Sequence, residues 1–358
     1  MTKLSNSKKR RTKKLNPFEF LVKRLKILKF ERNPELLSQL EQVGDGIVNE
    51  FKRWTPLKLA TLSYYVQQYL NIIRGLEENK GAVKIFYIDI FAGSGLNKIK
   101  DVDLLFAGSP LVAIDCASEA KRQFDYILLN DLKYGHILKR RIEKLKDLDE
   151  RYSWLDEVTI DVRSEDANDA LEYFVKEYIL RERYKNYLAF IDPYRSEISR
   201  KALEALLRIR YGDIFMTFQA RSIAREIGGY NKGIKGEGIE KELTAFFGVH
   251  PAIWSKLNSE QKVLDFYIAN IIGKYKPYST IIKIKGGKSA KGFGYALIFA
   301  TGKKNPGWKP FIENMKKIEL FDGDIVEAAC NVLTGKTKTI TEYFQEDDED
   351  KGLLRWFK

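Results

Sequence analysis

The segment YIDIFAGSG, residues 87–95, combines residue types that suit a ligand-binding turn. An apolar run that starts at residue 84 leads into Asp89, and Gly93 and Gly95 follow. Glycine lets the backbone turn tightly and approach a ligand closely, because it has no Cβ atom. The carboxylate at the end of the strand accepts hydrogen bonds from hydroxyl or amino groups. The segment therefore predicts a small-molecule site at the end of a strand.

The same segment lacks the features of two common nucleotide sites. A dinucleotide-binding loop has a third glycine and opens a helix, whereas AGSGLN has only two glycines. A phosphate-binding loop ends in Gly-Lys and then Ser or Thr, which does not occur here. A ligand without phosphate, such as S-adenosylmethionine, fits better. The segment resembles motif I of class I methyltransferases, most closely the DxFAGSG form of DNA and RNA methyltransferases.

Three further carboxylates follow apolar runs: Asp131 in LLNDL, Asp166 in VRSEDA and Asp192 in FIDPYR. Open α/β sheets bind ligands beyond the carboxyl ends of their strands. We expect Asp131 to accept both ribose hydroxyls and Asp166 to accept the adenine amino group, although each acid could instead cap a helix. We assign binding of S-adenosylmethionine to these residues: Asp89, Phe91, Ala92, Gly93, Gly95, Asp131 and Asp166.

IDPY, residues 191–194, resembles motif IV of amino-methylating enzymes, usually written [DNS]PP[YFW]. In that motif the first residue and a backbone carbonyl accept bonds from the target amino group, and the aromatic ring stacks on a flipped base. This chain has a single proline there, and Arg195 replaces the glycine of the DP[FY]G form in guanine-N2 tRNA methyltransferases. The resemblance implies catalytic roles for Asp192, Pro193 and Tyr194 and an exocyclic nitrogen as the target.

Apolar runs typical of buried strands alternate with helical patterns through the middle of the chain. The first five runs lie at 84–91, 124–131, 157–163, 186–194 and 212–219. Two more, at 279–285 and 293–301, are joined by a short glycine-rich link and predict an antiparallel hairpin. The pattern predicts an α/β fold with a doubly wound, mostly parallel sheet of seven strands. Parallel strands closed by an antiparallel pair is the Rossmann-like arrangement of class I methyltransferases.

The sequence divides into six predicted parts. These are a basic disordered arm (1–15), an N-terminal helical extension (16–80), a cofactor-binding α/β core (81–220), a Gly-rich loop with a helical insertion (221–276), the final strands (277–335) and an acidic tail (336–358). In the extension, we expect a helix capped by Thr55 that ends near Gly75. The Gly-rich segment RSIAREIGGYNKGIKGEG predicts a loop that orders on a substrate.

Charge favours an anionic partner, with nucleic acid first. The 358 residues include 62 Lys and Arg against 49 Asp and Glu, a net charge of +13. We assign nucleic-acid contacts to Arg195, Arg221, Arg225 and Lys232, which are equally compatible with solvated surface charges.

Cysteine and histidine content argues against several chemistries. The chain has two Cys, two His and no CxxC or HxxxH pattern, so no metal site and no disulfide framework is predicted. Cys116 is expected to be a small buried residue. No apolar run reaches the roughly 18 residues of a membrane span. We therefore expect a cytoplasmic, nucleoid-associated protein without a membrane partner.

A broader resemblance covers roughly two thirds of the chain. Residues 54–302 look like the three-Cys-motif partner (TcmP) family, on the strings WTPLKL, YYVQQYLNI, YIDIFAGSG, AGSPLVA, LLNDL, AFIDPY and GYALIFAT. That resemblance implies a methyltransferase-like fold. AGSPLVA also resembles the GSPL(I/V)A segment of bacterial N6-adenine rRNA methyltransferases, which carry a similar insertion between the glycine loop and the next acid.

The C-terminal DKGLLRWF, residues 350–357, resembles peptides that bind PCNA-type sliding clamps, Qxx[ILM]xx[FYW][FYW]. Leu353, Trp356 and Phe357 occupy the three apolar positions, and Asp350 replaces glutamine. The alternative is a terminal helix that packs these side chains onto its own fold. TKTITEYF, residues 337–344, also fits the pattern, but we expect it to form a last strand or helix of the fold.

These features together predict an S-adenosylmethionine-dependent methyltransferase acting on an exocyclic amino group of a nucleic-acid base. DNA is the preferred substrate, adenine N6 the favoured target and the sliding clamp the recruiting partner. Two alternatives remain: a non-catalytic adaptor that binds DNA and the clamp, and an rRNA or tRNA methyltransferase.

Overall fold

A computed structural model of the chain describes residues 23–51, 53, 55–99, 102–234, 236–284, 293–303, 309, 313, 316 and 324–336. The predicted basic arm (1–15) lies outside these residues, as do the link between the last two predicted strands and the tail beyond Lys336. The expected clamp-binding residues Leu353, Trp356 and Phe357 belong to that tail.

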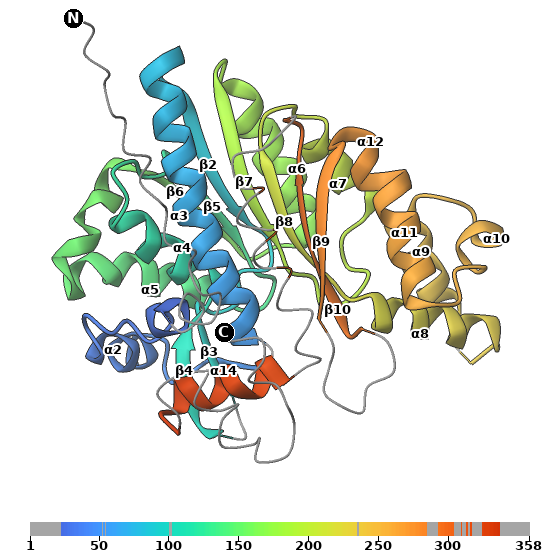
Figure 1. Cartoon of the computed structure of the whole chain (residues 1–358), viewed down its shortest axis with the longest axis horizontal. Coiled ribbons are helices and arrows are strands. Elements are labelled where there is room, and N and C mark those ends of the chain that lie inside the picture. Colours follow the sequence, from blue (N-terminus) through green and yellow to red (C-terminus); the bar gives the residue numbers. More distant parts are fainter. Residues whose placement is uncertain are drawn as a thin grey trace, which may run out of the picture.

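The centre of the molecule is a seven-stranded sheet with the order β6-β5-β2-β7-β8-β10-β9 (Figure 1). Its strands are β2 (Lys84–Asp89), β5 (Tyr126–Asn130), β6 (Thr159–Arg163), β7 (Lys185–Ile191), β8 (Asp213–Phe218), β9 (Tyr278–Ile284) and β10 (Tyr295–Thr301). The first five are parallel, and β10 runs antiparallel to both of its neighbours, β8 and β9. The predicted mixed α/β fold and its closing antiparallel pair are confirmed.

Helices cover both faces of this sheet. Alternate residues of each strand point to opposite faces, so Ile85 and Tyr87 of β2 join one apolar cluster and Phe86 and Ile88 join the other. The first cluster includes residues of α2 (Glu35–Val43), α3 (Thr55–Lys80), α4 (Ser109–Ser118), α5 (Gly135–Leu148) and α14 (Asp324–Thr334). The second includes residues of α6 (Ala167–Glu177), α7 (Arg200–Leu207), α8 (Ala220–Asn231), α9 (Glu237–Phe247) and α11 (Glu260–Tyr267).

Short helical segments connect these elements. They are η2 (Glu150–Glu157), η3 (Ile179–Arg181), α10 (Pro251–Trp254), η4 (Ile268–Ile272) and α12 (Gly273–Tyr275). In the part of the chain that the structure describes, no helix combines the length and apolar character needed to cross a membrane.

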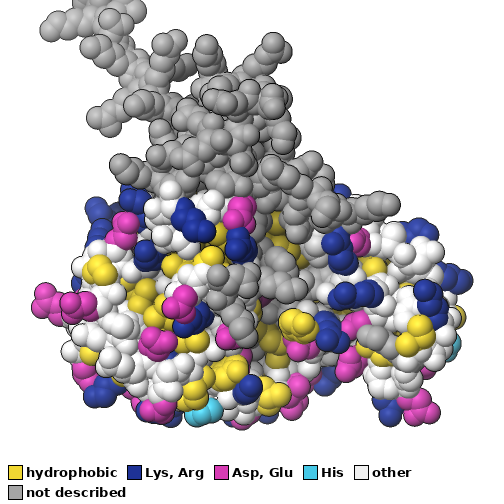
Figure 2. Space-filling view, turned by 90° about the horizontal axis from the view of Figure 1, so that it is seen from below, with side chains coloured by type: hydrophobic (Ala, Val, Ile, Leu, Met, Phe, Trp, Pro, Cys, Tyr) yellow, Lys and Arg dark blue, Asp and Glu magenta, His cyan; other side chains and the backbone are white. Residues whose placement is uncertain are grey.

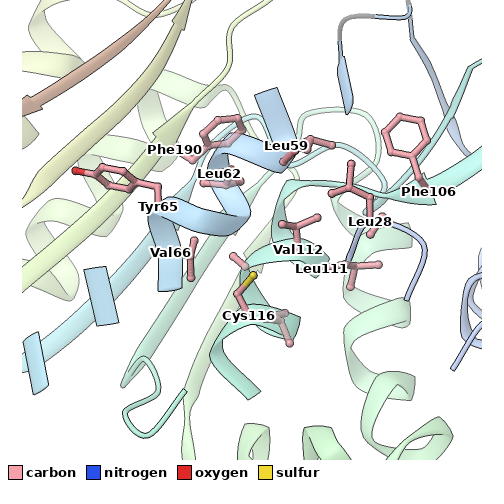
Figure 3. Packing of buried hydrophobic residues seen from close by; sticks show 14 of the residues in the cluster. Leu28, Leu59, Leu62, Tyr65, Val66, Phe106, Leu111, Val112, Cys116 and Phe190 are labelled. Atoms are coloured by element: carbon pink, nitrogen blue, oxygen red, sulfur yellow. The ribbon is translucent and has the colours of Figure 1, made fainter. Parts of the chain in front are cut away.

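Helix α3 packs lengthwise against the sheet and against α4 (Figure 3). Leu62 and Val66 of α3 are buried in the same cluster as Phe190 of β7 and Val112 of α4. Cys116 of α4 lies in this layer, where burial raises the pKa of its thiol and its Sγ is 3.3 Å from the Ser63 carbonyl oxygen. The expectation of a small buried residue at this position is confirmed.

Helix α3 starts where we expected, at Thr55, but its expected cap and its expected end were wrong. The helix continues through Gly75 to Lys80, and Gly81 at φ +88° follows it. Four of the five residues after Gly75 are good helix formers, and the cost of an interior glycine, about 1 kcal/mol, does not stop the helix. At the other end the buried hydroxyl of Thr55 bonds to no described group, so it does not cap the helix.

A second, three-stranded sheet was not predicted. It consists of β1 (Asn49–Phe51), β3 (Leu96–Ile99) and β4 (Leu104–Ala107), with β1 parallel to β3 and β3 antiparallel to β4. Strands of three and four residues are too short to show a period in the sequence. The small sheet joins the N-terminal extension to the chain that follows the glycine loop.

The prediction of a Gly-rich loop after β8 was also wrong in part. The first half of that segment forms helix α8. Ala220, Ile223 and Ile227 recur at helical spacing and are fully buried in the second apolar cluster. Burial of this stripe outweighs the low helix propensity of the glycines at 228 and 229.

Candidate functional site

Three of the predicted acids lie at one edge of the large sheet. Asp89 ends β2, Asp131 follows β5 and Asp192 follows β7. These strands are parallel neighbours in the order β5-β2-β7, so their carboxyl ends meet at the same edge. Figure 2 looks onto this edge, where apolar side chains lie among Lys, Arg, Asp and Glu. The sequence argument from successive strand ends is correct in placing these acids together.

The loop 90–95 has the backbone that its glycines were expected to provide. Gly93 and Gly95 have φ angles of +62° and +84°, which favour glycine. A Cβ atom on Gly93 would lie 2.7 Å from Asn49 Oδ1, and one on Gly95 would lie 2.9 Å from Leu138 Cδ1. Both the backbone conformation and the neighbouring side chains therefore favour glycine at these positions.

Asp131 fixes this loop. Its Oδ2 accepts a hydrogen bond from the Gly93 N–H at 3.0 Å, and its Oδ1 accepts from the N–H groups of Lys133 at 3.1 Å and Tyr134 at 2.7 Å. A carboxylate has about four acceptor positions. These three bonds leave Asp131 one free acceptor position. We had expected it to accept bonds from two ribose hydroxyls.

Asp89 is fully buried beneath the loop. Its Oδ1 accepts from the Phe91 N–H at 3.3 Å, and its Oδ2 accepts from the Tyr87 hydroxyl at 3.3 Å. Burial raises the pKa of Asp89 to about 7, and the nearby charge of Asp192 acts in the same direction. The carboxyl group therefore titrates close to neutral pH and can act as either a donor or an acceptor.

Asp192 is paired with a lysine that the sequence analysis did not select. The ammonium group of Lys58, in the first turn of α3, contacts Asp192 Oδ2. Lys58 is only 5% exposed, and its Nζ lies 5.4 Å from the ring centroid of Phe51. The charge of Asp192 adds to burial in raising the pKa of Tyr295. The end of β7 is therefore enclosed by α3 and by β10.

Two buried hydroxyl groups lie beside this pair. Thr217 of β8 is next to Asp192, because Ile191 and Met216 are register partners in the parallel pair β7–β8. Thr55 lies one turn before Lys58 in α3. Both Oγ1 atoms are inaccessible to solvent and bond to no group among the described residues. Buried polar atoms of this kind are usually satisfied by water or by a ligand.

Pro193 is buried, whereas Tyr194 extends into solvent with 69% of its surface exposed. The Tyr194 N–H donates to Glu197 Oε2 at 2.7 Å, and the Arg195 guanidinium lies 5.1 Å from the Tyr194 ring centroid. An aromatic ring presented in this way is available for stacking.

The four basic residues assigned to nucleic acid have different surroundings. Arg195 pairs with the buried Glu226 of α8 at 3.1 Å, and Arg221 pairs with Glu260 of α11 at 2.7 Å. Arg225 and Lys232 are exposed, the latter just beyond the end of α8. The first two charges therefore have structural partners, and the other two fit the alternative of solvated charges equally well.

Asp166 caps a helix, which is the alternative to its expected contact with adenine. Its Oδ1 caps α6 by accepting from the Asn168 N–H at 2.8 Å. The residue is exposed at the end of β6, the outermost parallel strand. Its expected contact with adenine stays a prediction.

Two further residues that hold the glycine loop were missed. Asn49 Oδ1 in β1 accepts from the Ser94 N–H at 2.6 Å. Arg141 of α5 is fully buried and donates to the carbonyl oxygens of Leu40 at 2.8 Å, Ile47 at 2.5 Å and Ser94 at 2.7 Å. Burial lowers the pKa of Arg141 to about 10.

A signal for Arg141 and Lys58 exists in the sequence. Arg141 falls on the apolar stripe of its helix with Leu138, Ile142 and Leu145, and Lys58 falls on the stripe of Leu62 and Tyr65. A cation on an apolar stripe indicates a buried partner. No comparable signal marks Asn49, whose role depends on an unpredicted strand.

Comparison with known proteins adds little to this geometry. No protein-family model matches the chain, and no curated protein matches it. Among solved structures, the chain is similar to the crystal structure of protein LPL1258 from Legionella pneumophila, of family model DUF519. The identity is 13%, the match covers 73% of this chain and 90% of that chain, and the TM-score is 0.40. A similarity at this level carries no functional argument.

Proposed function

We propose that the chain is an S-adenosylmethionine-dependent methyltransferase that acts on an exocyclic amino group of a nucleic-acid base, with DNA preferred and adenine N6 favoured. The observation that carries the proposal is the adjacency of two features at one sheet edge. The glycine loop after β2 lies beside Asp192-Pro193-Tyr194 after the neighbouring strand β7. Parallel strands closed by an antiparallel pair support a class I methyltransferase fold.

The residues present fit the cofactor in part. Gly93 and Gly95 lack Cβ atoms on either side of Ser94, and Asp131 retains one acceptor position. The buried hydroxyls of Thr55 and Thr217, which bond to no described group, are polar groups that a ligand near Asp192 would satisfy. S-adenosylmethionine supplies an activated methyl group when bound, so the protein needs mainly to position an amino nitrogen in line with it.

The residues after β7 would hold the target base. Asp192 would accept a hydrogen bond from the amino group, and the exposed ring of Tyr194 would stack on the base. Pro193 restricts the backbone between them. The excess of positive charge supports binding to a polyanion.

Calorimetry with S-adenosylmethionine tests the cofactor site. We expect micromolar binding by the wild-type protein and its loss in Asp131→Ala, with Asp147→Ala, an exposed acid of α5, as the control. Labelled methyl transfer onto DNA and onto RNA then identifies the substrate. Transfer to RNA alone would establish the rRNA or tRNA alternative.

Variants of the base site separate catalysis from binding. Tyr194→Ala should lose methyl transfer and keep cofactor affinity, whereas Tyr194→Phe, which keeps the ring, should retain most activity. Because Tyr194 is exposed, neither change should affect folding. Full activity of Tyr194→Ala would contradict the assigned stacking role.

One observation favours the second candidate, a non-catalytic adaptor. The Lys58 ammonium occupies Asp192 Oδ2, the carboxylate that would have to accept the target amino group. An adaptor would bind DNA with a steep salt dependence and transfer no methyl group. DNA binding that is equal in wild type and Asp192→Ala, with no transfer by either, would establish the adaptor.

Recruitment by a PCNA-type clamp is a separate part of the proposal and depends on residues 350–357. Deletion of 350–358 should abolish clamp binding in calorimetry and leave cofactor binding unchanged. An unchanged affinity for the clamp would refute recruitment through this tail.

A further inference from the structure

A cavity of about 840 Å³ lies at the edge of the sheet opposite to the candidate site. Its lining includes the first residues of β7 and β8 and the last residue of the antiparallel strand β10. The second half of α3 and the end of α7 contribute the walls. The volume falls within the usual range for small-molecule sites, roughly 300–1,000 Å³.

The floor of this cavity is apolar. Ile73 of α3, Val83 before β2, Val175 of α6 and Ile209 after α7 line it. Leu180 of η3 also lines it and keeps 57% of its surface exposed. Such a floor favours a ligand with an apolar or aromatic body.

The rim carries an excess of positive charge. The cations that line the cavity are Arg183, Lys185, Arg208, Arg210 and Lys303, against the single carboxylate of Asp213. Asp213 accepts from the Tyr65 hydroxyl at 3.0 Å, and Arg208 has Glu204 within 3.6 Å. In the part of the chain that the structure describes, Arg183 and Arg210 form no ion pair. This rim is complementary to an anion.

Two exposed aromatic rings lie beside Arg183 and Arg210. Tyr184 and Tyr211 line the cavity and are 63% and 59% exposed. The Arg183 guanidinium lies 5.2 Å from the Tyr184 centroid, and that of Arg210 lies 5.5 Å from the Tyr211 centroid. Each pair offers a ring and a guanidinium plane, both of which stack on planar rings.

The wall between α7 and β8 is rigid. Lys276 is fully buried and donates from Nζ to the carbonyl oxygens of Ile209 at 2.7 Å and Gly212 at 3.0 Å. A Cβ atom on Gly212, whose φ is +151°, would lie 2.2 Å from the Tyr187 ring. These contacts hold the segment that carries Arg210 and Tyr211 in place.

We infer that this cavity is a second binding site, for a ligand that joins a planar aromatic ring to a phosphate group, as nucleotides do. The ring would lie on the apolar floor between the tyrosines, and the phosphate would contact Arg183 and Arg210. The ligand could be a free mononucleotide or the phosphorylated end of a nucleic-acid strand, which share this chemistry.

Calorimetry with adenosine 5′-monophosphate tests the inference on the full chain. We expect saturable binding by the wild-type protein, weakened about tenfold or more in Arg183→Ala/Arg210→Ala, since a charge-assisted bond contributes roughly 1.5–3 kcal/mol. Tyr184→Ala/Tyr211→Ala should weaken binding as well. All four side chains are exposed, so the variants should fold normally. The control Lys139→Ala/Lys256→Ala removes two exposed cations elsewhere and should bind as wild type.

Four ligands resolve the chemistry. Adenosine and ribose 5-phosphate should each bind more weakly than the nucleotide, because each lacks half of the required ligand. A 5′-phosphorylated single strand that binds more tightly than adenosine 5′-monophosphate identifies a strand end, and the reverse order identifies a free nucleotide. The inference is overturned if neither adenosine 5′-monophosphate nor the 5′-phosphorylated strand binds. It is also overturned if both double variants bind these ligands with the wild-type affinity.

The result is independent of the proposed methyltransferase site. Titrations repeated with excess S-adenosylmethionine should give the same affinity, because the two sites lie at opposite edges of the sheet. Competition by S-adenosylmethionine that disappears in Asp131→Ala would place the nucleotide in the glycine-loop site and overturn the inference.

Discussion

Lys58 and Asp192 form a buried ion pair between residues 134 positions apart in the chain. Their side chains are 6% and 14% exposed. The pair holds the first turn of α3 over the end of β7, beside Tyr194. Removing one partner of such a pair leaves an uncompensated charge, which costs more than the pair contributes.

We expect Lys58→Met to lower the free energy of unfolding by about 3 kcal/mol at neutral pH, because the Asp192 carboxylate loses its counter-ion. The double variant Lys58→Met/Asp192→Asn should be more stable than Lys58→Met alone. Urea unfolding measures both. Lys144→Met removes an exposed partner of Asp147 and should change stability by well under 1 kcal/mol. Additive effects of the two substitutions would show that the pair is not coupled.

Asp89 should make stability depend on pH. Its folded-state pKa of about 7 lies above its ordinary value of 3.8, so the folded state holds the proton more tightly. The associated stability is fully present below about pH 4 and is lost as the pH rises through 7. Relative to wild type, Asp89→Asn should therefore become more stable as the pH increases from 4 to 7. Urea unfolding of both proteins across this pH range measures the difference in stability, and a constant difference would disprove the assignment.

Gly93→Ala should lose stability for two reasons, its φ of +62° and the contact of the new methyl group with Asn49. Gly46→Ala is the matched control, since its φ is +73° but no atom lies within 4 Å of the added carbon. We expect Gly93→Ala to lower the melting temperature more than Gly46→Ala does. In an Asn49→Ala background, Gly93→Ala should lower stability less than it does in the wild type; an equal loss in the two backgrounds would mean that backbone strain alone causes it.

Arg141→Met should loosen the glycine loop, because three carbonyl oxygens lose their shared donor. Hydrogen exchange should speed up in residues 40–47 and 93–96. The neighbouring Arg140→Met removes only an exposed pair with Asp45 and should leave exchange unchanged. Equal exchange in the two variants would contradict a role for Arg141 in holding the loop.

The seven main strands were predictable because each is an apolar run bounded by polar residues, and the positions of Asp89, Asp131 and Asp192 follow from their places at strand ends. The contacts that complete the site were not predictable. Lys58 and Asn49 reach it from the N-terminal extension, and a sequence pattern does not specify which distant segment packs over a strand end. Helix α8 was not predicted, because its two adjacent glycines indicate a loop more strongly than its short apolar stripe indicates a helix.

Hydrogen bonds connect the glycine loop to both sheets. The Gly93 N–H donates to Asp131, which follows β5 of the large sheet, and the Ser94 N–H donates to Asn49 in β1 of the small one. Any ligand that orders this loop must therefore also stabilise residues 35–51, in which Arg141 holds two carbonyl oxygens. By thermodynamic linkage the effect is reciprocal, so opening of the N-terminal extension lowers ligand affinity by the same factor by which the bound ligand suppresses that opening.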